Sequence, residues 1–188
     1  MQLPFFPDAG VTLCMKFILG SGGQLRNRLK IFPEYYQYTF SCSPILVISF
    51  TGDDEVVGAC GISNISNYAQ VYVQEEYRGR GLGTRVVVKA CGEARKRGLN
   101  FVTAAIDLWN EPSLSVFSKA GFREIVRFKT YGYVIMMLPF NFKGKLLYAS
   151  LNTLCSFLPE TFLHYLIICL MSVVGQTRQR LIANWVGV

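Results

Sequence analysis

A glycine-rich segment at residues 78–84 has the composition of an anion-binding loop. It reads Arg-Gly-Arg-Gly-Leu-Gly-Thr and lies between a β-branched run and a helix-like run. Glycines adopt positive φ angles and let a ligand approach the backbone. The start of a helix adds unpaired N–H groups and the positive end of the helix dipole. The segment therefore predicts a phosphate or pyrophosphate ligand, although a tight connection without a ligand would show similar glycines.

Two familiar phosphate-binding loops do not fit this segment. A Walker A loop closes with Gly-Lys-Ser/Thr, which is missing here. A dinucleotide-binding loop has the spacing G-x-G-x-x-G, whereas Gly79, Gly81 and Gly83 alternate. The expected ligand is therefore an anion of another kind.

The composition restricts the possible partners. The chain has 188 residues, 51% of them hydrophobic and 16% charged, with a net charge of +7. This length suits one domain with a full core. The basic charge is compatible with an anionic ligand or a membrane surface, but no long block of Lys and Arg is present, so we expect no nucleic-acid partner.

The cysteines and the single histidine exclude the usual metal sites. Six cysteines are scattered without a C-x-x-C pair, and His164 is the only histidine. No zinc-ligand spacing can be formed from them, so we expect no metal. The pattern predicts free, mostly buried thiols and a cytoplasmic location. His164 lies in an apolar run, which favours a structural role.

Alternating strand and helix patterns must position the loop. Residues 1–14 are expected to be a flexible lead-in, and residues 15–140 one domain. Residues 24–38 have helical spacing that Pro33 breaks. An antiparallel meander leads into the loop, and two helices and three strands follow. The predicted strands are 16–19, 45–50, 56–63, 69–73, 101–108, 124–129 and 133–138, and the helices are 84–97 and 110–121.

A second motif lies downstream of the loop. Residues 110–113 read Asn-Glu-Pro-Ser, and residues 116–122 read Val-Phe-Ser-Lys-Ala-Gly-Phe. With both motifs at this separation, the chain resembles the GNAT superfamily of acyl-CoA-dependent N-acyltransferases over about residues 15–140. The resemblance implies an α+β fold, with a mixed, mostly antiparallel central sheet flanked by helices. It also implies that the strand ending at Val73 splays from the strand ending near Leu108, with acetyl-CoA or another acyl-CoA in the gap.

The resemblance assigns roles to both motifs. Backbone N–H groups of residues 80–84 would hold the CoA pyrophosphate, with the Thr84 hydroxyl as a further donor. Backbone groups of Val71 and Val73 would meet the pantetheine and the thioester carbonyl, the Val73 N–H acting as oxyanion donor. Asn110 would bind pantetheine, cap its helix, or both. The implied cofactor-binding residues are Val71, Val73, Arg78, Gly79, Arg80, Gly81, Leu82, Gly83, Thr84, Asn110 and Phe117; Arg78 and Arg80 could equally be plain surface residues.

The implied reaction transfers an acyl group from the CoA thioester to an amine acceptor. Family members often carry a Tyr general acid where this chain has Phe117. Water or a neighbour (Ser118, Tyr131 or Tyr133) could replace that acid. Alternatively, the thiolate leaves without help, or the protein is an acyl-CoA-binding module with little or no catalysis.

The general base and the acceptor are not identified by the sequence. Acidic residues near the expected cleft are Glu75, Glu76 and Asp107, and a water chain could serve instead. The tyrosines of residues 35–38 could line an acceptor pocket, but surface or core packing is the favoured interpretation.

Residues 141–188 are expected to form an apolar helical extension beyond the family domain. A helix over 146–158, a break at 159–161 and an apolar run over 162–174 are expected. That run is shorter than the roughly 20 apolar residues of a membrane span. Packing on the domain or homodimerisation through these helices is favoured over peripheral membrane contact.

Overall fold

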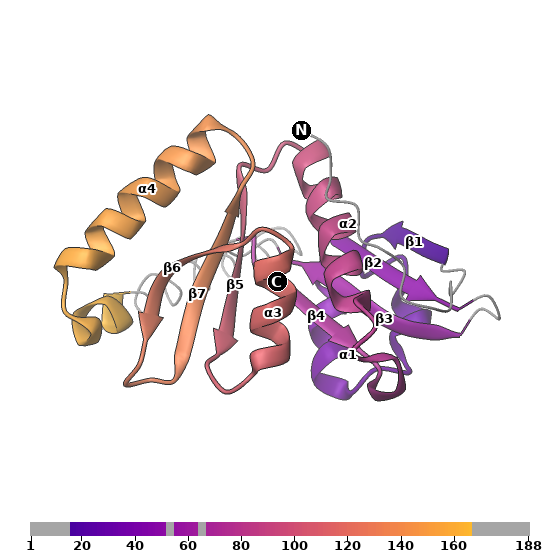
Figure 1. The fold of residues 1–188 in the computed structure, drawn as a ribbon. Helices are drawn as coiled ribbons and strands as arrows, with labels where there is room; N and C mark the ends of the chain where they lie inside the picture. Colours follow the sequence, from indigo (N-terminus) through magenta and orange to yellow (C-terminus); the bar gives the residue numbers. More distant parts are fainter. Residues whose placement is uncertain (1–15, 52–54, 64–66, 167–188) are drawn as a thin grey trace, which may run out of the picture.

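Two antiparallel sheets form the centre of the protein (Figure 1). The structure is a computed structural model that describes residues 16–51, 55–63 and 67–166. The first sheet has the order β1-β2-β3-β4 and the second the order β5-β7-β6. The strands are β1 (Lys16–Gly20), β2 (Ile45–Phe50), β3 (Val56–Ile62), β4 (Ala69–Val73), β5 (Phe101–Asp107), β6 (Arg123–Phe128) and β7 (Tyr133–Pro139).

The two sheets meet at the beginnings of β4 and β5. A parallel bridge pairs Tyr68 with Thr103, and the Thr103 N–H donates to the Asn67 carbonyl at 3.0 Å. Beyond this bridge the strands belong to different sheets and diverge toward their carboxyl ends (Figure 1). The predicted splay between the strand ending at Val73 and its neighbour is confirmed. It opens a gap between the facing edges of two parallel strands, where a ligand could meet backbone groups.

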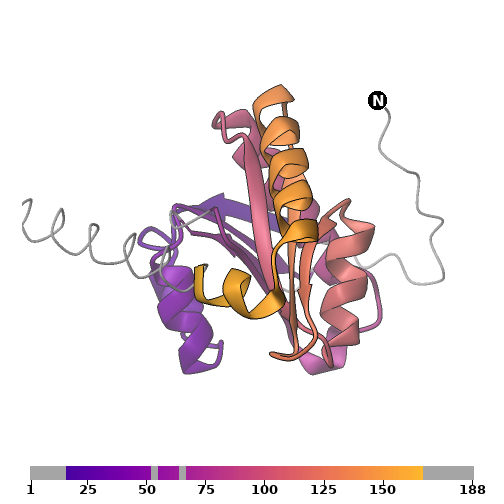
Figure 2. The ribbon, with the colours of Figure 1, turned by 90° about the vertical axis from the view of Figure 1, so that its left-hand side faces the viewer.

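Helices cover both faces of the sheets, as predicted for the α+β class. The α2 helix packs on one face of the first sheet, and α1 covers the other face. Figure 2 shows α1 and α3 on opposite sides of the strands. Because β2 is covered on both faces, all its residues are buried, and all of them except Ser49 are apolar. The helices are α1 (Glu34–Ser41), α2 (Leu82–Lys96), α3 (Glu111–Lys119) and α4 (Phe142–Phe157), with short 3-10 turns η1 (Arg26–Leu29) and η2 (Glu75–Tyr77).

The extension after residue 140 begins as a helical hairpin on the second sheet. The α4 helix starts at Phe142, earlier than predicted, because the Asn141 side chain caps it by accepting from the Gly144 N–H at 3.0 Å. Gly144 allows close docking, since a Cβ there would lie 2.1 Å from the Asn100 carbonyl oxygen. The chain breaks after Phe157 and is helical again over 160–166. The predicted helix, break and restart are confirmed, and α4 packs on β6 and β7.

Parts of the predictions for the two ends fall outside the described residues. These are the lead-in 1–14 and the apolar run beyond residue 166. Within the described residues, no helix has the length and apolar character needed to cross a membrane. Dimerisation and peripheral membrane contact through the extension stay predictions.

The described cysteines are free, and their burial predicts unequal reactivity. Cys42 is exposed, whereas Cys60 and Cys91 are buried. Burial raises the pKa of Cys91 to about 12 and that of Cys60 well above its ordinary value. Because the thiolate is the reactive form, iodoacetamide at about pH 8 should label Cys42 in the native protein and spare the two buried thiols. Peptide mass mapping measures this; equal labelling of Cys91 and Cys42 would contradict the buried placement.

Candidate active site

The glycine loop ends in an uncapped helix N-terminus. Gly79 and Gly81 have φ angles of 75° and 73°, and Gly81 is the N-cap of α2. The first helical hydrogen bond runs from the Arg85 N–H to the Gly81 carbonyl at 3.2 Å. The N–H groups of residues 82–84 therefore have no partner within the helix. No side chain caps this end and its first turn contains no acid, so the helix offers its N–H groups and dipole to an anion.

The helix begins two residues earlier than predicted, because its first turn packs inward. Leu82 and Thr84 are buried, and a Cβ on Gly83 would lie 3.0 Å from Val116 Cγ2. Gly83 thus allows α2 to approach α3 closely. Thr84 is only 8% exposed, so its side chain belongs to this packing while its N–H stays at the helix start.

The two loop arginines are exposed but held near the loop. Arg78 Nε donates to the Val73 carbonyl at 3.1 Å, which ties the loop to the end of β4. The Arg80 guanidinium lies 5.6 Å from the centre of the Tyr77 ring. Both charges therefore stand beside the uncapped end of α2, where an anionic ligand would gain from them.

The register of β4 decides which backbone groups face the gap. The Ser63 N–H donates to the Tyr68 carbonyl and the Gln74 N–H to the Val57 carbonyl, both at 2.9 Å. Even-numbered residues of β4 thus direct their backbone groups to β3. Because directions alternate along a strand, Val71 and Val73 direct theirs into the gap. The edge of β4 therefore offers backbone donors and acceptors where the resemblance had required them.

The α3 side of the gap carries two predicted site residues. Asn110 Oδ1 caps α3 by accepting from the Ser113 N–H at 3.2 Å, so its capping role is confirmed. Its amide nitrogen is not used by this cap. Phe117 is 3% exposed, and its ring meets the Phe122 ring edge-on with centroids 4.9 Å apart. Both Asn110 and Phe117 line the gap.

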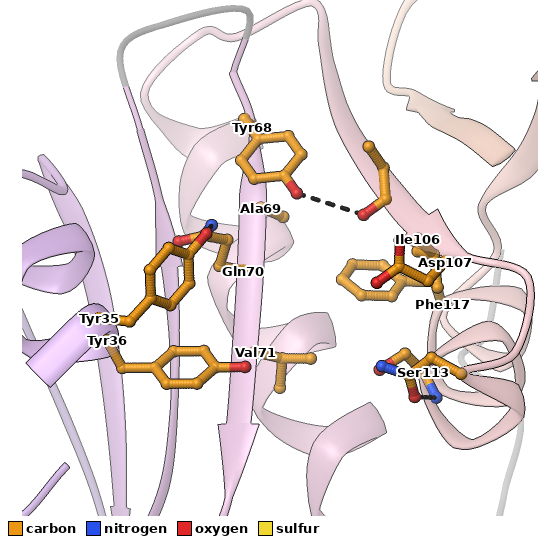
Figure 3. A pocket seen from close by; sticks show the side chains of 12 residues that line it. Tyr35, Tyr36, Tyr68, Ala69, Gln70, Val71, Ile106, Asp107, Ser113 and Phe117 are labelled. Atoms are coloured by element: carbon orange, nitrogen blue, oxygen red, sulfur yellow. Dashed lines mark hydrogen bonds between the residues drawn. The ribbon is translucent and has the colours of Figure 1, made fainter. Parts of the chain in front are cut away.

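A cavity of about 310 Å³ lies between β4 and β5 (Figure 3). The α3 wall presents Asn110, Ser113 and Phe117. The opposite wall is aromatic, and Asp107 at the end of β5 points its carboxylate into the space between the walls. The remaining lining residues are Tyr35, Tyr36, Tyr68, Ala69, Gln70, Val71, Ala105 and Ile106.

The aromatic wall corrects the expectation for residues 35–38. Tyr35 and Tyr36 line the cavity, whereas Tyr38 is 76% exposed and lies away from it. Gln70 Nε2 donates to the Tyr35 hydroxyl at 2.8 Å, and the Tyr36 and Tyr72 rings lie 4.8 Å apart. The pKa of Tyr36 is raised, mainly because the side chain is partly buried and secondly because Tyr35 lies beside it. Sequence reasoning favoured packing because nothing local shows that the first turn of α1 reaches β4 across the sheet.

The structure does not bring the two candidate acids to the cavity. The Tyr133 hydroxyl and His164 Nδ1 share a 2.9 Å hydrogen bond, and the Tyr131 ring stacks on the imidazole at 3.5 Å. These contacts attach segment 160–166 to the β6–β7 turn, which confirms a structural role for His164. Neither tyrosine lines the cavity, and Ser118 is exposed on α3.

The acidic residues also separate. Glu75 and Glu76 are exposed in η2, and only Asp107 of the three lines the cavity. Among the described residues, no group of three or more His, Cys, Asp or Glu side chains could hold a metal ion. The site's chemistry therefore depends on backbone groups, phenols and one carboxylate.

Comparisons with known proteins agree with this architecture. Residues 24–122 match the model of the acetyltransferase (GNAT) family. A curated relative, an uncharacterized N-acetyltransferase of Methanocaldococcus jannaschii, is 31% identical over 74 residues, which span 35% of this chain and 33% of the relative. The chain thus matches about a third of that relative's length.

Solved structures share the fold at low sequence identity. Salmonella typhimurium yncA, solved with its cofactor acetyl-CoA, has a TM-score of 0.57 and 16% identity, over 68% of this chain and 95% of that one. A ribosomal-protein-alanine N-acetyltransferase of Brucella melitensis has a TM-score of 0.55 and 18% identity, over 66% and 99%. A phosphinothricin acetyltransferase of Sinorhizobium meliloti in complex with AcCoA has a TM-score of 0.53 and 17% identity, over 69% of this chain and 90% of that one.

Proposed function

Because the chain belongs to the acetyltransferase (GNAT) family, we propose that it transfers an acetyl or other acyl group from acyl-CoA to an amine. The observation that carries this proposal is the gap between β4 and β5, which opens toward the uncapped N-terminus of α2. Calorimetric titration with acetyl-CoA, followed by an amine-panel acetylation assay with mass detection, tests it. Absence of CoA binding would overturn the proposal.

The residues of the loop fit an acyl-CoA. A Cβ built on Gly79 or Gly81 would meet nothing within 4 Å, so the space beside the loop is open. We assign the pyrophosphate to the N–H groups of residues 80–84, with Arg78 and Arg80 as electrostatic support. The backbone of Val71 and the amide nitrogen of Asn110 would bind the pantetheine arm. Acetyl-CoA in the solved structures that share the fold supports an acyl-CoA as the ligand.

The proposed reaction needs few side chains. The neutral amine attacks the thioester carbonyl carbon of acyl-CoA and forms the new C–N bond. The C–S bond then breaks, the nitrogen loses a proton, and the departing CoA sulfur gains one, so the products are the amide and CoA. The Val73 N–H, which faces the gap, stabilises the negative charge that develops on the carbonyl oxygen. An arriving ammonium group loses its proton to water or to Asp107, the carboxylate in the cavity.

Tyr36 is our proposed substitute for the acid that Phe117 cannot provide. Its hydroxyl points into the cavity toward the α3 wall (Figure 3). A phenol with its ordinary pKa of 10.0 is already protonated at neutral pH, and the raised pKa of Tyr36 keeps it so; its hydroxyl can therefore donate a hydrogen bond to the departing sulfur. Tyr131 and Tyr133 are still predicted candidates for the general acid. Tyr36 is favoured over them because both contact His164 instead of the cavity.

The Tyr36→Phe variant tests this role. A hydrogen bond to a charged group contributes about 1.5–3 kcal/mol, so kcat should fall about 10- to 100-fold while CoA binding is unchanged. Tyr38→Phe is the matched control, since Tyr38 lies on the same helix but outside the cavity. The added hydroxyl of Phe117→Tyr should raise turnover in the Tyr36→Phe background. CoA binding without turnover in the wild-type protein would instead support the binding-module alternative.

We also propose a cytoplasmic location and a homodimer built through the extension. The free thiols Cys60 and Cys91 support the cytoplasmic location.

The homodimer is supported by side chains of α4 that point away from the sheet: Leu154 is 47% exposed and Phe157 is 80% exposed. The double variant Leu154→Ser/Phe157→Ser should shift the protein from dimer to monomer in analytical ultracentrifugation, with an unchanged melting temperature. A wild-type monomer that floats with anionic vesicles would support membrane contact instead.

A further inference from the structure

The cavity is acidic, although the chain as a whole is basic. The chain has a net charge of +7. Of the described residues that line the cavity, Asp107 alone has a charged side chain. From this we infer, on the basis of the proposed acyl transfer, that the acceptor is a small primary amine with an apolar or aromatic body and no carboxylate beside the amine.

The position of Asp107 suits the recognition of an ammonium group. It is the last residue of β5, and its carboxylate points into the gap toward the wall that α1 and β4 form (Figure 3). Its backbone carbonyl accepts from the Asn110 N–H at 2.9 Å, which fixes the strand end. An ammonium group between this carboxylate and the phenols would gain a charge-assisted hydrogen bond.

The phenol rings supply the apolar part of the subsite. The Tyr35 and Tyr36 rings meet edge-to-face with centroids 5.3 Å apart. The Tyr68 hydroxyl donates to the Ala105 carbonyl at 3.2 Å and so spans from β4 to β5. Aromatic faces attract cations and stack with flat apolar groups. This wall therefore fits an amine with an alkyl or aryl body, which would lie against the phenol rings while one side of the cavity stays open to solvent, since Tyr35 is 64% exposed.

An acceptor carboxylate has no counterpart in this part of the cavity. The described lining residues include no Lys, Arg or His. Arg78 does not line the cavity, and its Nε donates to the Val73 carbonyl at the end of the gap assigned to the phosphates; its charge lowers the pKa of Tyr36 only against the larger effect of burial. A carboxylate next to the amine would lie beside Asp107, and like charges at such distances repel. Free amino acids should therefore be poor acceptors.

Matched acceptor pairs test the inference. The wild-type protein with acetyl-CoA is assayed on tyramine against tyrosine and on tryptamine against tryptophan, with tyrosine amide as a further acceptor. We expect kcat/KM for each amine to exceed that of its amino acid by about tenfold or more. Tyrosine amide keeps the bulk of tyrosine without its charge. It should therefore resemble tyramine if charge decides, and tyrosine if size decides.

The Asp107→Asn variant separates binding from folding. It should raise the KM for tyramine about tenfold, narrow the difference between tyramine and tyrosine, and leave the affinity for CoA and the melting temperature unchanged. Glu111→Gln is the control, because Glu111 carries an equal charge and is exposed, as Asp107 is, but does not line the cavity.

Three results would overturn the inference. The first is amino acids acetylated as well as their amines. The second is a KM for tyramine that Asp107→Asn does not change. The third is acetylation of no panel member by a protein that still binds CoA. Absence of CoA binding, in contrast, would overturn the proposed function itself.

Discussion

Replacing Gly81 with glutamate is expected to abolish CoA binding. Gly81 is the N-cap of α2, and a Cβ at this position would enter the open space beside the loop. The new carboxylate would lie where we place the pyrophosphate, and two unit charges about 4 Å apart near a protein surface repel by about 4 kcal/mol. The affinity for CoA, measured by calorimetric titration, should fall by at least about 100-fold.

Gly98→Glu is the matched control for this variant. Gly98 follows the other end of α2 with a φ angle of 80°, and a Cβ there would likewise meet nothing within 4 Å. Both substitutions add one negative charge and the same left-handed backbone strain, about 1–2 kcal/mol. Equal losses of CoA affinity in the two variants would show that strain or net charge, rather than position, is responsible. That outcome would remove the loop from the proposed site.

Replacing Val73 with proline should lower kcat about 100- to 1000-fold, because it removes the proposed oxyanion donor. The fold should tolerate this change. Val73 directs its N–H into the gap rather than to β3, and proline is accepted at an edge strand where its missing N–H faces away from the ladder. Steady-state kinetics with acetyl-CoA measures kcat, and calorimetry should show that CoA still binds.

Val73→Ala tests whether the side chain contributes to that loss. It keeps the N–H but removes the γ-methyl groups, of which Cγ2 would lie 3.7 Å from a Cβ built on Gly83. We expect a small change in kcat and a modest loss of thermal stability. A kcat for Val73→Pro within a factor of about three of the value for Val73→Ala would exclude the oxyanion role, since one lost donor costs far more.

Local sequence was sufficient to predict the elements and the glycine loop at the start of α2. The strands and the helices α2 and α3 begin and end within a few residues of their predicted bounds. The conformation at Gly79 and Gly81 could be predicted without the tertiary structure, because the positive φ angles and the helix start depend on adjacent residues. The cap at Asn110 and the break at Pro33 are similarly local.

Tertiary structure alone decided which side chains meet in the gap. Tyr35, Gln70 and Asp107 come from α1, β4 and β5, and no spacing in the sequence relates them. Tyr131 and Tyr133 were equally eligible by residue type, but the restart of the helix after Pro159 brings His164 onto them instead. A tyrosine that is distant from the glycine loop in sequence lines the cavity only because β4 and β5 diverge beside it.

The physical reason lies in the range of the interactions. Loop conformation, capping and strand alternation depend on neighbours a few residues away, so the sequence by itself determined the loop at which we propose that an acyl-CoA binds. The acceptor wall depends on contacts between α1, β4 and β5, which form when both faces of the first sheet are covered. The tertiary structure therefore decided that this wall is aromatic, that Asp107 is its one charged group among the described residues, and that Tyr36 lies opposite Phe117.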